Sequence, residues 1–131
     1  MASLLSLGDP ERIVWKQPVT SSRFAEAQRH GFSTWGYVLD QAAHLGDNLK
    51  RYAADNAIDM LGASQARPDA FIATVARTAL SQQKKMIGWD IRDVKSRARM
   101  LRLGCTGIAS SDIKKMLQNP VSATELPQAE R

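Results

Sequence analysis

Residues 90–104, DIRDVKSRARMLRLG, are the stretch on which the expected fold depends. Apolar side chains recur through it at helical spacing. Asp90 stands where a helix N-cap is expected, and Gly104 stands where a helix would stop. The stretch therefore predicts a helix. The segments on either side of it have similar helix-capping and helix-ending residues.

The same helix is rich in cations. At about 100° per residue, its apolar and basic side chains fall on neighbouring arcs, so one side would pack on the protein and the other would point to solvent. Further lysines precede and follow it. The outward cations are Arg92, Lys95, Arg99 and Arg102, supported by Lys84 and Lys85 upstream and by Lys114 and Lys115 downstream.

Helical periodicity and capping signals extend over most of the chain. One segment, RIVWKQPV at residues 12–19, instead alternates like an edge strand or an extended arm. Further helices are expected over residues 21–30, 34–45, 48–61, 69–87 and 111–117.

These elements predict a mainly α protein with a single domain of about five or six helices. An extended N-terminal arm or short strand would occupy residues 1–20, and the helical domain would occupy residues 21–119. Residues 120–131 would form a flexible tail. A chain of 131 residues with 44% hydrophobic residues can bury a core of its own.

The composition favours a reducing compartment, because Cys105 is the one cysteine and has no partner for a disulfide. No apolar run approaches the roughly 18 residues that a membrane span needs. The N-terminus does not have the pattern of a signal peptide. We therefore expect a cytoplasmic protein that does not use a membrane.

Catalytic and metal-binding signatures are missing from the sequence. His30 and His44 lack metal-ligand spacing, and no phosphate-loop, dinucleotide, zinc-protease or CxxC motif is present. Cys105 has no neighbouring base that would activate its thiol. The sequence thus predicts a non-enzymatic protein without a metal or cofactor.

The net charge is +5, and all of the excess positive charge lies in residues 70–119. Lysine and arginine side chains that neutralise phosphates release counterions, which gives strong, salt-dependent binding. The leading hypothesis is a small basic nucleic-acid-associated protein that contacts phosphates through its basic helix. Changing both Lys95 and Arg99 to glutamate is expected to abolish this binding and to leave the fold intact.

The alternative hypothesis is an interaction or assembly protein, such as a particle subunit or a small inhibitor, that docks its basic helix on an acidic protein surface. Its N-terminal arm, with Trp15, would suit contact with a neighbouring subunit in a homo-oligomer.

Two segments suggest DNA-reading units. Residues 91–103 and 111–118 could form a helix-turn-helix, although their connection is longer than usual. In residues 12–43, RIVWKQPV, SSRFAEAQRHG and FSTWGYVLDQAA follow one another like a ribbon and two helices, so this part resembles a ribbon-helix-helix domain. The resemblance implies a dimer in which Arg12, Val14 and Lys16 enter the major groove.

Overall fold

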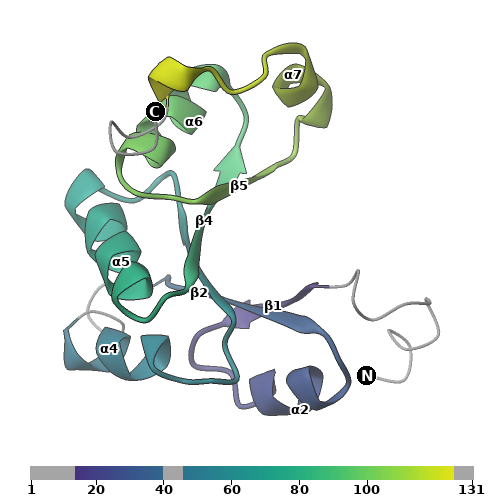
Figure 1. The fold of residues 1–131 in the computed structure, drawn as a ribbon, viewed down its shortest axis with the longest axis vertical. Coiled ribbons are helices and arrows are strands. Elements are labelled where there is room, and N and C mark those ends of the chain that lie inside the picture. Colours follow the sequence, from purple (N-terminus) through teal and green to yellow (C-terminus); the bar gives the residue numbers. More distant parts are fainter. Residues whose placement is uncertain (1–13, 40–45, 126–131) are drawn as a thin grey trace.

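The computed structural model describes residues 14–39 and 46–125 (Figure 1). Strands and helices alternate along this part of the chain. In order, the elements are β1 (Val14–Pro18), α2 (Phe24–Arg29), β2 (Ser33–Tyr37), α4 (Asp47–Ala53), β3 (Met60–Ser64), α5 (Asp69–Ser81), β4 (Lys85–Ile91), α6 (Val94–Arg102), β5 (Gly107–Ser110), α7 (Ile113–Gln118) and the 3-10 helix η2 (Ala123–Glu125).

The five strands form one parallel sheet with the order β1-β2-β3-β4-β5. The protein is therefore an α/β protein, and both the mainly α expectation and its description as helical are wrong. Helices α2, α5, α6 and α7 and the first part of the expected 48–61 helix are confirmed. Strand β2 replaces the start of the expected 34–45 helix, β3 replaces the end of the expected 48–61 helix, and β4 replaces the end of the expected 69–87 helix. Short buried strands are hard to distinguish from buried helices by their apolar residues alone.

The helices that contact the sheet share one of its faces. Phe24 of α2 lies beside Gly36, which pairs with Leu61, and Leu61 pairs in turn with Met86. Gly88 lies two positions beyond Met86 and so faces the same way, and it lies beside Met100 of α6. Helix α5 lies between these two helices and contacts β3 and β4 (Figure 1). The buried core lies between this face and the helices.

The other face of the sheet carries Lys16, Trp35, Tyr37, Ile87 and Trp89, and we call it the aromatic face. Strands β1 and β4 are separated by two strands, which would place them about 14 Å apart in a flat sheet. Nevertheless, Lys16 of β1 touches the ring of Trp89 of β4. The sheet must therefore curl with the aromatic face inside, as it does in the wall of a β/α barrel.

Neither DNA-reading unit is present. Strand β5 lies between α6 and α7, so these helices do not form a helix-turn-helix. Residues 33–37 form β2 and pair in parallel with β1, whereas a ribbon-helix-helix domain would need a helix there. The strand predicted at residues 12–19 is confirmed over residues 14–18. Arg12 and His44 lie outside the described residues.

In the segment expected to be a tail, Glu125 accepts hydrogen bonds from Arg97 of α6. Within residues 14–39 and 46–125, no helix has the length and apolar character that a bilayer span requires.

Candidate anion-binding site

One lysine on the aromatic face lies over three aromatic rings. The Nζ atom of Lys16 is 4.7 Å from the ring centroid of Trp35, 5.2 Å from that of Tyr37 and 4.8 Å from that of Trp89. These distances fall within the range of cation–π contacts. Among the described residues, no carboxylate forms an ion pair with Lys16. Its positive charge is therefore available to an external anion.

The rings below Lys16 are held by the sheet and by one another. Tyr37 and Trp89 meet edge to face, with ring centroids 6.0 Å apart. The indole of Trp35 lies across Gly62, where a Cβ atom would come within 2.0 Å of Nε1. A glycine at this position therefore allows the ring to lie against the backbone of β3.

Indole N–H groups add unsatisfied donors to this face. The Nε1 atoms of Trp35 and Trp89 are buried and have no acceptor among the described residues. An unpaired buried donor costs free energy, but neither Nε1 atom is open to an external ligand, and that of Trp35 lies against the backbone of β3. The ammonium of Lys16 is therefore the group on this face that favours an external oxyanion.

An open recess adjoins Lys16 at the carboxyl ends of β4 and β5. Its volume is about 420 Å³, and it is lined by Lys16, Trp89, Asp90, Ala109, Ser110 and Ser111. Ligands of parallel α/β proteins bind at the carboxyl ends of the strands, where the loops diverge. The recess therefore lies where the architecture favours a ligand.

Asp90 is the carboxylate in this recess. Its backbone has φ of 61°, a left-handed conformation that aspartate and asparagine adopt more often than other non-glycine residues. Its Oδ1 atom accepts a hydrogen bond from Nε of Arg92 at 3.2 Å. Arg92 thus offsets the negative charge that would otherwise repel an anion.

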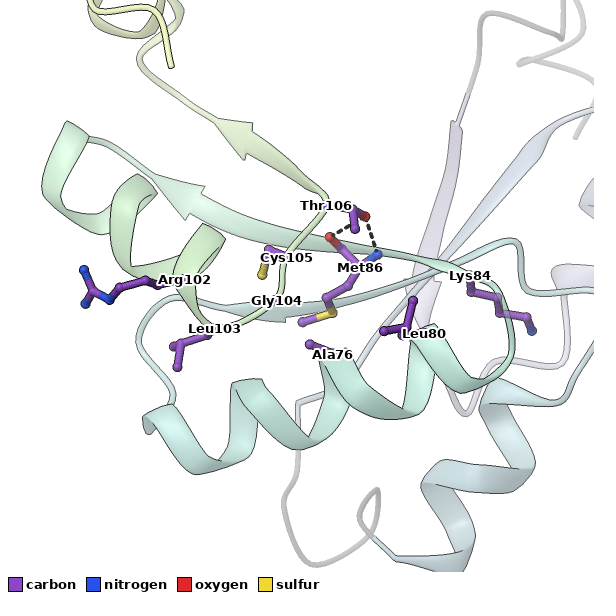
Figure 2. Close-up of a pocket in the computed structure, with 9 residues that line it drawn as sticks. All are labelled: Ala76, Leu80, Lys84, Met86, Arg102, Leu103, Gly104, Cys105 and Thr106. Atoms are coloured by element: carbon purple, nitrogen blue, oxygen red, sulfur yellow. Dashed lines mark hydrogen bonds between the residues drawn. The ribbon is translucent and has the colours of Figure 1, made fainter. Parts of the chain in front are cut away.

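A second recess lies near the amino ends of the strands, between α5 and the turn from α6 to β5 (Figure 2). Its volume is about 280 Å³. Burial raises the pKa of the Cys105 thiol to about 11, so this side chain is a neutral part of the wall. The lining residues are Ala76, Leu80, Lys84, Met86, Arg102, Leu103, Gly104, Cys105 and Thr106.

Arg99, one of the predicted phosphate contacts, is occupied within the protein. Its guanidinium donates to Oδ1 of Asp69 at 2.7 Å and to the carbonyl oxygens of Gln65 and Arg67. These bonds tie α6 to the loop between β3 and α5. Arg99 therefore has a structural role, and replacing it would disturb the contact between α6 and the loop from β3 to α5.

The other predicted cations are divided among separate places. Lys84 and Arg102 line the second recess, and Lys85 begins β4. Lys95, Lys114 and Lys115 are exposed on α6 and α7. A backbone hydrogen bond from Ser96 lowers the pKa of Asp93, and the charges of Lys115 and Lys95 lower it further.

The sequence did not reveal the cluster around Lys16. The alternating pattern of residues 12–19 placed Lys16 on one side of a strand, but nothing in it linked β1 to Trp89. The sequence also did not distinguish Arg97, which is buried against Glu125. A signal for Arg97 was its position outside the arc of the other helix cations.

No group of three His, Cys, Asp or Glu side chains in the described parts of the chain is arranged to hold a metal ion. Comparison with protein families, curated proteins and solved structures found no match to this chain.

Proposed function

We propose that the protein binds a small molecule that carries a phosphate group, and that the aromatic face holds it. The observation that carries this proposal is the unpaired ammonium of Lys16 above three aromatic rings, beside the recess at the carboxyl ends of β4 and β5. The proposal is one of binding and includes no reaction.

A phosphate suits this site because it carries negative charge and several acceptor oxygens. Lys16 can supply a charge-assisted hydrogen bond, and Ser111, which lines the same recess, has a hydroxyl group that can donate another. A planar group attached to the phosphate would also find ring surface to pack against.

Titration with inorganic phosphate and with phenyl phosphate tests this proposal, with tryptophan fluorescence and calorimetry as readouts. We expect phenyl phosphate to bind more tightly than inorganic phosphate. Lys16→Gln should weaken phenyl phosphate binding by at least about tenfold, as expected when one charged contact is lost. Lys50→Gln, which removes an exposed lysine from α4, should bind like the wild type.

Equal affinity in the Lys16→Gln and Lys50→Gln proteins would contradict the proposal. So would an absence of binding at millimolar ligand concentration. If benzoate binds as tightly as phenyl phosphate, the site recognises an aromatic anion in general and the assignment to phosphate is wrong.

A second candidate function is contact with a polyanion through the outer side of α6 and α7. Lys95 and Lys114 are exposed and make no ion pair among the described residues, and Lys115 is exposed on the same helix as Lys114. Nucleic acid is the partner that we propose, because exposed cations recognise phosphates without requiring a groove-reading motif.

This second candidate requires a different double variant from the one suggested by the sequence, because Arg99 holds α6 to its neighbour. The change Lys95→Glu with Lys114→Glu should abolish shifts of DNA and RNA in a gel at low salt. Lys50→Glu with Arg77→Glu, on other helices, gives the same change in net charge and should retain the shift. Binding to an acidic protein surface in place of nucleic acid would support the assembly alternative and overturn this one.

A further inference from the structure

We infer that the recess in Figure 2 binds a medium-chain fatty carboxylate, with its alkyl tail inside and its headgroup at Arg102. This recess is distinct from the aromatic face, and the inference does not depend on the function proposed above.

The walls of the recess suit an alkyl chain. Ala76 and Leu80 of α5 face Met86 of β4 and Leu103 at the end of α6. Cys105 adds a protonated thiol, which behaves as a small apolar group. Water in such a recess finds few hydrogen-bond partners, so its displacement by methylene groups is favourable.

Two cations, one at each end of the recess, decide which way round a bound carboxylate would lie. Figure 2 shows Lys84 and Arg102 at opposite ends, with Leu80 and Met86 between them. The Nζ atom of Lys84 already donates to the carbonyl oxygen of Asp55 at 2.6 Å. Arg102 makes no ion pair among the described residues, and its guanidinium extends away from the recess. A carboxylate would therefore remain near solvent at Arg102 while the tail enters.

Two further features keep the recess accessible and apolar. Leu80 is 73% exposed at its rim, although a leucine gains free energy when it is covered. Gly104 has φ of +111°, and a Cβ atom there would come within 3.0 Å of the Cβ of Ala76. The glycine thus leaves this wall without a side chain that would narrow the opening.

Titration with sodium decanoate, below its micelle-forming concentration and followed by protein NMR, tests the inference. Signals of Ala76, Met86 and Cys105 should shift, and acetate, which lacks a tail, should not shift them. Arg102→Gln should weaken decanoate binding by about tenfold and leave decan-1-ol binding unchanged, because only decanoate presents a charge. Lys95→Gln removes the same charge from α6 at a position that does not line the recess and should bind decanoate like the wild type.

Filling the recess provides an independent check. Ala76→Leu should block decanoate, and if that variant does not fold, Leu80→Asn at the exposed rim should weaken binding several-fold. Equal binding by the Arg102→Gln and Lys95→Gln proteins would overturn the inference, as would unchanged binding in the filled or rim variant. Lys16→Gln should have no effect on decanoate; if it abolishes binding, the fatty acid occupies the aromatic face instead.

Discussion

Arg97 has the character of a surface cation in the sequence but is buried in the structure. It belongs to the most basic segment of the chain, yet it is only 2% exposed. Its Nε and Nη2 atoms each donate to Glu125 at 2.8 Å, and Nη1 donates to the carbonyl oxygen of Asn119. A buried guanidinium requires such partners, because an unpaired charge in the interior is strongly unfavourable.

Replacing Glu125 with alanine should therefore destabilise the protein well beyond the loss of a surface ion pair. We expect the free energy of unfolding, measured in urea, to fall by about 3 kcal/mol, because Arg97 would remain buried without its carboxylate. Glu26→Ala breaks the exposed pair with Arg23 and should cost less than about 1 kcal/mol. Similar losses in the two variants would show that Arg97 finds solvent when Glu125 is removed.

The sequence could identify cations but not their partners. It counted Arg99 among the phosphate contacts, although Asp69 lies thirty residues away in sequence and meets it only in the folded chain. The sequence could not show the contacts of Lys16 either, because the rings that it meets lie on β2 and β4. Partners so distant along the chain leave no periodic signal, so a single sequence could not separate free cations from occupied ones.

At the scale of elements, helices were easier to predict than strands. Helices α5 and α6 are amphipathic and cover one face of a sheet, so their apolar residues recur at helical spacing. Strands β2 and β3 lie inside the sheet, and their buried residues are consecutive instead of alternating. Gly62 and Ala63 in β3 also have low strand propensity, and tertiary packing decides their conformation.

Gly62 provides a test of how tightly β3 is packed. A Cβ atom there would lie 2.0 Å from Nε1 of Trp35 and 3.0 Å from the carbonyl oxygen of Ile87. Because neither a tryptophan ring nor a backbone can yield easily, Gly62→Ala should lower the free energy of unfolding by about 2–3 kcal/mol and change the tryptophan emission.

Gly107→Ala is the matched control for this variant. Its Cβ atom would meet only Cδ1 of Ile87, at 2.9 Å, and this terminal atom can rotate away. The control should lose less than about 1 kcal/mol. If the two glycine variants have equal stability, the indole of Trp35 does not lie across β3.

The attachment of the C-terminal segment to α6 should depend on pH. Hydrogen bonds from Arg97 hold the pKa of Glu125 below its ordinary value. A carboxyl group with a lowered pKa stabilises the folded state at pH values above its unfolded pKa of about 4.3. That contribution disappears as pH falls through the lower folded value.

Unfolding in urea at a series of pH values from 7 to 3 would measure this dependence. The wild type should lose more stability on acidification than Glu125→Gln, whose side chain carries no titrating proton. The difference between the two proteins should therefore shrink below about pH 4. Parallel pH profiles would show that the pair with Arg97 does not contribute to acid sensitivity.

At the scale of the whole molecule, sequential strand order and helices on one face determine where ligands can bind. The curl brings β1 and β4 together on the inner face, so Lys16 meets Trp89. The second recess lies on the helix side, between α5 and the turn that follows α6, near the amino ends of the strands. The composition predicted a buried core, and the described residues contain one, but strand order depends on crossovers that no local pattern encodes.

Cys105 offers a measure of whether this sheet opens as one unit. Its thiol is 4% exposed, and burial raises its pKa to about 11. The folded protein therefore holds the thiol proton more tightly than the unfolded chain does, and this stabilisation is present below pH of about 8.5 and lost as pH rises toward 11. At pH 8, alkylation should require opening and be at least about a thousandfold slower than in urea.

If the sheet unfolds cooperatively, a defect in β3 must also expose Cys105, which lies two residues before β5. Gly62→Ala should then accelerate alkylation of Cys105 by the factor that corresponds to its loss of stability, about tenfold for each 1.4 kcal/mol. Gly107→Ala, beside the cysteine but mild in its packing effect, should accelerate it much less. If Gly62→Ala leaves the alkylation rate unchanged, β4, α6 and β5 open on their own, and the curled sheet consists of separately unfolding parts.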